Sequence, residues 1–208
     1  TSSHMPFVGG SAAFVLPAVY GTAQVSTHMD QEPNIGGCCA LYPDDANELH
    51  TLLDQPCRRV THTVNEPAWL TPSIVAAPLA GELDQNLIVQ VPESQIVFAG
   101  AMCSFGVTPM AGLGSPATWA DSLDTLLGWG EIFVPGHGPI GGNEEVLAQQ
   151  AYLRACVEAQ GDPSALGDGP WREWSGQEYH TINVERAALL AQGKDEPPAA
   201  LLRLLGVS

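Results

Sequence analysis

Short apolar runs in the middle of the chain have the length and composition of β-strands. Residues 74–77, 87–91 and 95–99 form three such runs, and each is bounded by polar or turn-forming residues. The tripeptide Pro92-Glu93-Ser94 separates the last two, so we expect it to turn them into a hairpin. A fourth short strand is predicted at residues 131–134. These strands make a sheet the centre of the expected fold.

Helical spacing of apolar residues follows these runs. Ser115-Pro116 is typical of a helix start, because the hydroxyl can cap free N–H groups and proline lacks an N–H that is not needed there. Trp119, Leu123, Leu126 and Leu127 then predict one buried helix face. The other predicted helices cover residues 44–54, a segment capped by Asn143 with Val146, Leu147, Leu153 and Val157 on one side, and residues 177–192 and 198–205. Strands that lead into loops and helices indicate an α/β domain with a helical C-terminal tail.

Length and charge narrow the classes of function. With 208 residues, 45% of them hydrophobic and 14% charged, the chain can fill a real core and is not a disordered segment. Seven Lys and Arg stand against 23 Asp and Glu, which gives a net charge of −16. Because nucleic acids and anionic membrane surfaces are bound through basic residues, neither is an expected partner.

Two further features bear on location. The uncharged run at residues 94–120 is long enough to span a bilayer, but it contains four glycines as well as Pro109 and Pro116, so we interpret it as strand, loop and helix start. The five cysteines are odd in number and lack C-x-x-C spacing, which favours a reducing compartment. The sequence does not show the charged start and following apolar stretch that are typical of a signal peptide. The expected location is therefore cytoplasmic.

Four short segments occur in a fixed order and carry a family resemblance. They are Ile96-Val97-Phe98-Ala99-Gly100, Gly106-Val107-Thr108-Pro109, Trp119 with Ser122-Leu123-Asp124, and Val134-Pro135-Gly136-His137-Gly138-Pro139. This series resembles the second half of the metallo-β-lactamase superfamily. The later residues Trp174, Tyr179 and Asn183-Val184-Glu185-Arg186 are similar to the tail of its longer, cyclase-like members.

The resemblance implies an αββα sandwich of two mixed sheets with metals at the sheet edge, where a bridging water becomes the nucleophile. Residues 1–160 would form this domain, and residues 161–208 a helical extension packed on it. The strands that the family places before its first metal-binding motif are missing, so the first sheet is expected to be incomplete at its N-terminus. Such an open strand edge can pair with another chain, which predicts a homo- or hetero-oligomer.

Most metal-ligand positions of the family are lost at the N-terminus of the chain. Residues 1–10 align with the family motif T-H-x-H-x-D-H-x-G-G. Ser2 then replaces the first histidine, Pro6 the aspartate and Phe7 the third histidine, and only His4 matches. An alternative explanation of His4 stays open, because Ser3-His4-Met5 is also what a cleaved expression tag leaves behind.

The later ligand positions are mostly lost as well. The next histidine should lie within residues 79–85, where the sequence has Glu82 and Asp84, and the bridging aspartate is Ala101. His137 alone remains in the Pro-Gly-His-Gly-Pro segment. Two histidines leave a divalent ion two ligands short of a closed tetrahedral site, so we expect no metal pair and no other cofactor. A single, weakly bound zinc ion stays an open alternative.

His137 and Cys103 are the predicted catalytic residues. His137 could be a leftover ligand or a base, or a loop histidine hydrogen-bonded to backbone. Cys103 could act as a thiolate, or be an ordinary buried cysteine. Glu82 and Asp84 could replace lost ligands, or form a solvated loop pair. The residues expected to line a substrate pocket are Ser2, His4, Phe7, Glu82, Ala101, Trp171 and Trp174.

The aromatic residues of the tail and the remaining histidines say less about where a functional site lies. Trp171, Trp174 and Tyr179 could wall a hydrophobic pocket, but helix packing explains them equally well. His28, His50 and His62 share no spacing that would join them in one site. The sequence therefore does not decide whether the aromatic residues of the tail line a pocket or pack in the core.

Two functions from different classes follow. The first is an enzyme of the cyclase or thioester-hydrolase type that acts without the usual metal pair on a small hydrophobic, polyketide-like molecule. The second is a non-catalytic binding or partner subunit that keeps the fold. An enzyme should have an apolar pocket that ends on His137 or Cys103, whereas a subunit should have a filled pocket and an exposed apolar strand edge.

Overall fold

A five-stranded mixed sheet forms the centre of the computed structural model, which describes residues 2–14, 18–30, 38–40, 42–53 and 57–206. The strand order is β3-β4-β5-β6-β7. The pairs β3–β4, β4–β5 and β5–β6 are antiparallel, and the pair β6–β7 is parallel. The strands are β3 (Ala68–Thr71), β4 (Ile74–Leu79), β5 (Asn86–Val91), β6 (Ile96–Ser104) and β7 (Ile132–His137).

The predicted hairpin is confirmed. A single 3-10 turn, η3 (Pro92–Ser94), joins β5 to β6, and the register pairs Val91 with Ile96. Gln95 closes the turn with a positive φ of 55°. The pattern predicted the first halves of β4 and β6 but not their full lengths, since β4 continues to Leu79 and β6 to Ser104. The fold class, α/β, is as expected.

Helix α5 (Pro116–Leu127) begins where the sequence predicted it. The Ser115 hydroxyl accepts a hydrogen bond from the Thr118 backbone N–H at 3.2 Å. Trp119, Leu123 and Leu126 are buried, as the spacing requires.

Two details of the prediction for α6 (Asn143–Glu158) are wrong. The cap is Gly142, whose N–H donates to Oε2 of Glu145, rather than Asn143. Leu147 and Val157 are 48% and 37% exposed, because they lie about 100° around the helix from the buried positions beside them.

The remaining helices lie at both ends of the chain. The C-terminal pair α7 (Tyr179–Ala191) and α8 (Ala199–Leu204) matches the predicted segments closely. The helix predicted over residues 44–54 begins as a 3-10 turn, and residue 54 lies outside the described residues. The other elements are α1 (Met5–Val8), η1 (Gly9–Ala13), α2 (Ala23–Met29), η2 (Pro43–Asp45), α4 (Ala46–Leu53), η4 (Pro163–Ala165) and η5 (Pro170–Glu173).

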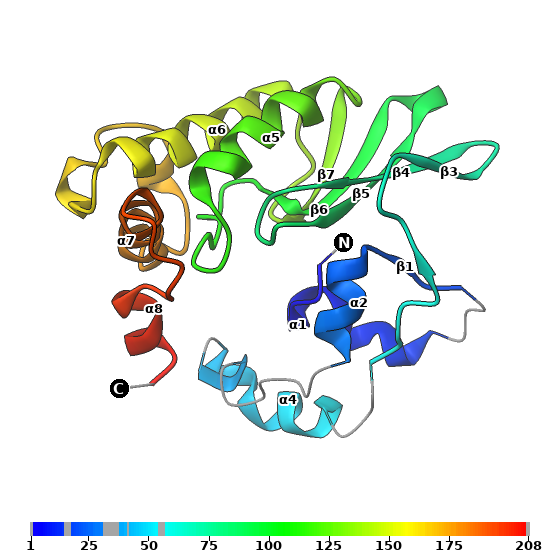
Figure 1. Ribbon diagram of the computed structural model, residues 1–208, viewed down its shortest axis with the longest axis horizontal. Coiled ribbons are helices and arrows are strands. Elements are labelled where there is room, and N and C mark those ends of the chain that lie inside the picture. Colours follow the sequence, from blue (N-terminus) through cyan, green and yellow to red (C-terminus); the bar gives the residue numbers. More distant parts are fainter. Residues whose placement is uncertain (1, 15–17, 31–37, 41, 54–56, 207–208) are drawn as a thin grey trace.

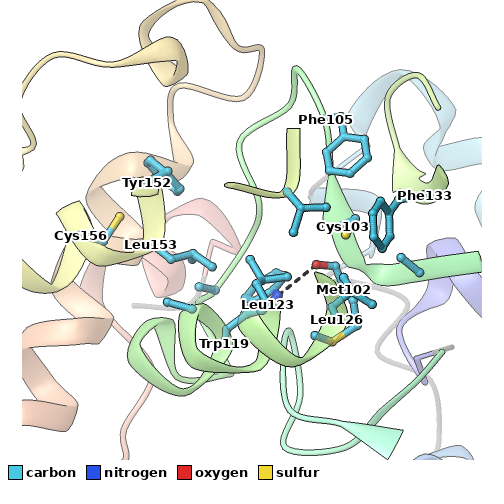
Figure 2. Packing of buried hydrophobic residues seen from close by; sticks show 14 of the residues in the cluster. Met102, Cys103, Phe105, Trp119, Leu123, Leu126, Phe133, Tyr152, Leu153 and Cys156 are labelled. Atoms are coloured by element: carbon cyan, nitrogen blue, oxygen red, sulfur yellow. Dashed lines mark hydrogen bonds between the residues drawn. The ribbon is translucent and has the colours of Figure 1, made fainter. Parts of the chain in front are cut away.

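Helices cover one face of the sheet and build the main core (Figure 1). Helices α5 and α6 lie side by side, α7 packs against α6, and α8 packs against α7. Trp119, Leu123 and Leu126 of α5 reach toward Met102 on β6, and the Trp119 Nε1–H donates to the Met102 carbonyl at 3.0 Å (Figure 2). Gln149 of α6 also donates to that carbonyl at 3.0 Å. Polar contacts therefore fix both helices on the β6 backbone.

The part of the chain before β3 contributes little sheet. Its described residues form only the two-residue strands β1 (Tyr20–Gly21) and β2 (His62–Thr63), which pair parallel with each other and not with the large sheet. This agrees with the expectation that the first sheet of a sandwich is incomplete. In the described part of the chain, no helix is both long and apolar enough to cross a membrane.

Candidate functional site

A cavity of about 580 Å³ lies between segments that are far apart in the sequence. Phe7 of α1 and Tyr42 approach it from the N-terminal part of the chain. Thr108 and Met110 belong to the loop between β6 and α5, and Leu201 belongs to α8. Since most lining side chains are apolar or aromatic and a few are polar, the cavity has the composition of a small-molecule site.

His4 and Glu82 form a close pair in this cavity. Nδ1 of His4 lies 2.5 Å from Oε1 of Glu82, and the two side chains are 29% and 12% exposed. Burial lowers the pKa of His4, but the hydrogen bond and the negative charge of Glu82 outweigh it, so the pKa of His4 lies above its usual 6.5. The pair brings together two residues that the sequence separately assigned to the pocket, His4 and Glu82.

The Pro-Gly-His-Gly-Pro segment ends β7 at the cavity. The rings of His137 and Phe7 meet edge to face, with centroids 5.4 Å apart, and His137 itself is exposed at the cavity mouth. A Cβ atom on Gly136 would lie 2.4 Å from the Phe7 ring. A Cβ atom on Gly138, where φ is +90°, would lie 1.8 Å from the Phe105 carbonyl oxygen. Close packing thus requires both glycines, whether or not this loop binds a metal.

The loop between β6 and α5 is held in place by the C-terminal tail. Asn183 accepts a hydrogen bond from the Ala111 N–H at 2.8 Å and donates to the Pro109 carbonyl at 2.6 Å. It also donates to the Tyr152 hydroxyl at 2.8 Å. The tail residues that resembled cyclase-like relatives therefore support one wall of the cavity.

Arg186 fixes the other end of the same loop. Its buried guanidinium donates to the carbonyls of Gly114 at 2.9 Å and Leu113 at 3.3 Å. The charge pairs with Asp195 at 2.6 Å. The side chains of Asn183 and Arg186 thus hydrogen-bond to the backbone of residues 109–114. These bonds hold this wall of the cavity in shape without a ligand.

Two buried polar atoms along the cavity lack a partner among the described residues. Oε2 of Glu82 and Oγ1 of Thr108 are both buried and make no hydrogen bond. Thr108 as a whole is 2% exposed, while its backbone N–H donates to the Ser175 carbonyl at 2.8 Å. Because a buried polar atom without a partner costs about 1–3 kcal/mol, both atoms are suited to meet a bound molecule.

Two half-buried tyrosines complete the polar lining. Burial first, and then neighbouring negative groups, raise the pKa of Tyr42 and of Tyr179. Glu82 is one of these groups for Tyr42, and Glu178 is one for Tyr179. Both phenols therefore stay protonated at neutral pH and can donate hydrogen bonds into the cavity.

The other predicted N-terminal and β6 residues are placed as follows. Ala101 lines the cavity and is 5% exposed. Ser2, which was also expected to line the cavity, is fully buried and does not line it. Its hydroxyl accepts a hydrogen bond from the His4 N–H at 3.2 Å. Cys103 does not line the cavity but lies in the core, and burial raises the pKa of its thiol far above the usual value. A thiol that stays protonated is a poor nucleophile, so the core interpretation of Cys103 fits this placement better.

The two tail tryptophans lie outside the cavity. Trp171 and Trp174 pack against Tyr152, with ring centroids 5.8 Å and 5.6 Å away, and belong to the core of α6 and α7. Only Tyr179, the third aromatic residue of the tail, lines the cavity. For the tryptophans, helix packing is the better explanation of the two that the sequence left open.

The remaining candidates are dispersed. Asp84 is exposed and accepts a hydrogen bond from Gln24 at 3.4 Å, as expected for a solvated loop carboxylate. His28 contacts Ser3 at 3.2 Å, and His62 contacts Thr61 at 2.8 Å. The side chain of His50 lies outside the described residues. None of these described side chains lines the cavity.

The side chains at the family's ligand positions do not fit a metal pair. Within the described residues, no three His, Cys, Asp or Glu side chains gather into a group that could hold a metal ion. Phe7 packs its ring against His137, and Nδ1 of His4 is occupied by Glu82. Ala101 offers no donor atom. We therefore derive no step of a mechanism through a metal.

Sequence reasoning missed several cavity residues. Tyr42, Thr108 and Met110 carried no motif that marked them as part of a pocket. Leu201 looked like an ordinary position of a helix face. The one usable signal was Gly106-Val107-Thr108-Pro109, which the resemblance singled out without giving Thr108 a role.

Comparisons with known proteins give only distant structural neighbours. No protein-family model and no curated protein matches the chain. Among solved structures, the DIM-1 metallo-β-lactamase is 18% identical with a TM-score of 0.47, and VMB-1 is 17% identical with a TM-score of 0.47. In each case the match covers 66% of this chain, which spans 57% of the other chain.

A third solved structure has a similarity of the same order. The metallo-β-lactamase FIM-1 from Pseudomonas aeruginosa, in its mono-zinc form, is 20% identical with a TM-score of 0.40, over 59% of this chain and 62% of that one. With TM-scores below 0.5, these structures leave the function of this chain to be inferred from its own residues.

Proposed function

We propose that this chain binds a small, largely apolar molecule in the cavity, through its own side chains and without a metal pair. The observation that carries the proposal is the cavity itself, about 580 Å³ in volume and lined mainly by apolar and aromatic groups. Cavities of about 300–1,000 Å³ with a few polar groups are typical of small-molecule sites. The partners Asn183 and Arg186 keep one wall preformed, which lowers the entropy lost on binding.

Binding of the uncharged fluorescent probe N-phenyl-1-naphthylamine tests the proposal. We expect saturable binding to the unmodified protein, with one probe per chain. Val107→Trp should abolish it, because Val107 lines the cavity and a larger side chain would fill it. Leu202→Trp should fill the same cavity from the side of α8. It replaces the first variant in the test if that variant does not fold.

The matched control is Ala117→Trp, at an exposed position of α5 that lines no cavity described for the chain. Circular dichroism would establish that each variant is folded. The proposal is wrong if the unmodified protein does not bind the probe, or if both cavity variants fold and bind it as well as the control does.

A second function is favoured by one specific observation, the His4–Glu82 pair beside an apolar cavity. Nδ1 of His4 faces Glu82, which leaves Nε2 as the ring nitrogen able to take a proton from water. The water oxygen would bond to the carbonyl carbon of a hydrophobic thioester, the C–S bond would break, and the proton would pass to the leaving thiolate. This is the hydrolase or cyclase type of activity that the sequence resemblance implies.

The thioester decanoyl-N-acetylcysteamine, with detection of the released thiol, tests this second candidate. His4→Gln and Glu82→Gln should each lower kcat at least about tenfold, since general acid–base help contributes about 10²–10⁴-fold. The rate should rise with pH as His4 loses its proton, through a pKa above 6.5. His62→Gln, far from the cavity, is the control, and equal rates in all four proteins would remove this candidate.

A further inference from the structure

The chemistry of the cavity lining points to the charge of its ligand. We infer that the cavity prefers a positively charged apolar molecule, an amine or quaternary ammonium ion, over neutral or anionic molecules of the same shape. The inference rests on the proposed binding function and adds the class of ligand to it.

The charged groups around the cavity are acidic or titratable, not permanently basic. Glu82 and Glu178 line it, with Glu178 exposed at the mouth, and no lysine or arginine does among the described residues. Two histidines, His4 and His137, also line the cavity among the described residues. An anionic ligand would therefore lose its hydration without gaining a fixed positive partner.

Glu82 retains one unused acceptor for a ligand. Oε1 is occupied by His4 at 2.5 Å, but Oε2 is buried and has no partner among the described residues. Even a protonated His4 leaves this second oxygen free to accept a hydrogen bond. An ammonium N–H is the donor that a carboxylate binds most strongly.

Thr108 is a second, independent sign that a ligand completes this wall. It is 2% exposed, lines the cavity, and has an Oγ1 atom without a hydrogen-bond partner. A hydroxyl can accept a hydrogen bond from an ammonium group as well as donate one. Glu82 and Thr108 together thus provide two buried acceptors along one apolar cavity.

Aromatic rings add an attraction for cations. Phe7, Tyr42 and Tyr179 all line the cavity. The negative faces of such rings attract ammonium ions electrostatically. A quaternary ammonium ion, which cannot donate an N–H, would depend on these rings and on the carboxylates alone.

Three naphthalene probes that share one apolar body test the inference. Isothermal titration calorimetry would compare 1-naphthylmethylamine, 1-naphthylmethanol and 1-naphthoate with the unmodified protein. We expect the amine to bind about tenfold or more tightly than the alcohol, as a hydrogen bond to a charged group predicts. The acid should bind most weakly.

Glu82→Gln should remove most of the preference for the amine, and Thr108→Val should weaken amine binding without reversing the order. The control Asp84→Asn changes the net charge by the same amount at an exposed site outside the cavity, and should leave the preference unchanged.

The outcomes separate this inference from the proposed function. If the three probes bind equally or the acid binds most tightly, the cavity is a binding site but the preference for cations is wrong. The preference is also wrong if Asp84→Asn lowers it as much as Glu82→Gln, because general attraction to the acidic chain would then explain it. If no probe binds, both the inference and the proposed function fall.

Discussion

The two faces of the five-stranded sheet differ in cover, although both are apolar. On the face toward α5 and α6, Ile88, Val97 and Phe133 are fully buried. On the opposite face, the register places Val89, Phe98 and Val134 in one row across three strands. There Phe98 is 46% exposed, and Ile132, one row away, is 43% exposed. Neighbouring positions along the same strand thus have opposite surroundings.

The comparison teaches that apolar composition does not by itself build a core. Among the described residues, the opposite face has only a small buried cluster around Val64, Ala76 and Leu87. A free apolar face fits the partner-subunit alternative, whereas an open cavity fits ligand binding. The structure has both features, so an oligomer formed through the sheet stays a prediction.

The largest effect is expected from matched substitutions on the two faces. Phe133→Ala should lower the free energy of unfolding by about 3–5 kcal/mol, because it empties a fully buried site. Phe98→Ala, the same change at a half-exposed site, should lower it by less than about 2 kcal/mol, since much of this ring already contacts water. Urea unfolding monitored by circular dichroism measures both.

Equal losses in the two variants would contradict the comparison. They would mean that the opposite face is covered in solution, and sedimentation velocity of the unmodified protein would then show an oligomer. Unequal losses are expected for the single chain, in which Phe98 is 46% exposed. Equal losses together with an oligomer would instead support the pairing through the sheet that the sequence predicts.

The next largest loss of stability is expected where α7 holds the loop between β6 and α5. Asn183→Ala should lower the free energy of unfolding by about 2–3 kcal/mol, because the Ala111 N–H and the Pro109 carbonyl lose a buried partner. It should also weaken binding of N-phenyl-1-naphthylamine, since the cavity wall loses its support. Asn143→Ala, exposed at the start of α6, is the control and should change neither quantity by more than about 0.5 kcal/mol. If the variant loses stability but binds the probe normally, the loop does not support the binding cavity.

A smaller effect is expected at the end of β7. Gly138→Ala should lower the free energy of unfolding by about 2 kcal/mol, because its φ is +90° and the added Cβ would meet the Phe105 carbonyl. Gly167→Ala is the matched variant, with φ of +74° but open space around it, and should cost only about 1 kcal/mol. If thermal or urea unfolding gives the same value for both, close packing does not explain the Pro-Gly-His-Gly-Pro segment.

The smallest effect depends on pH. Because the folded protein raises the pKa of His4, the pair with Glu82 stabilises the fold fully below about pH 6.5, and this contribution is lost as pH rises through the raised pKa. The stability difference between the unmodified protein and Glu82→Gln should therefore be larger at about pH 5.5 than at about pH 9. Nuclear magnetic resonance titration of the His4 ring should give a lower pKa in the variant. An unchanged His4 pKa would mean that the pair does not form.

The local pattern predicted most elements around the sheet, because each depends on neighbours in the chain. The hairpin at Pro92–Ser94 and the cap at Ser115 follow from residues a few positions apart. The pattern erred where burial depends on distant segments, as at Leu147 and Val157 of α6. The candidate site was predicted in part, since His4, Phe7, Glu82, Ala101 and His137 do line one cavity.

The rest of the site could not be derived from spacing. Trp171 and Trp174 fitted a pocket and a core equally, and only their packing against Tyr152 of α6 decides for the core. Regular strand alternation would place Cys103 on the same face as Ala101, but the register of β6 against β7 shifts between Gly100 and Ser104. Cys103 therefore lies in the core, whereas Ala101 lines the cavity. Thr108 gained its significance only from the unpaired hydroxyl.

By itself, the sequence determined the α/β class and the strands and helices around the sheet. These follow from residue type and from spacing over a few positions. Tertiary structure alone decided that His4 meets Glu82 across 78 positions, and that Asn183 and Arg186 hold the loop beside the cavity. It also decided which apolar face is covered. Contacts between distant segments depend on how the whole chain packs, and no local pattern contains that information.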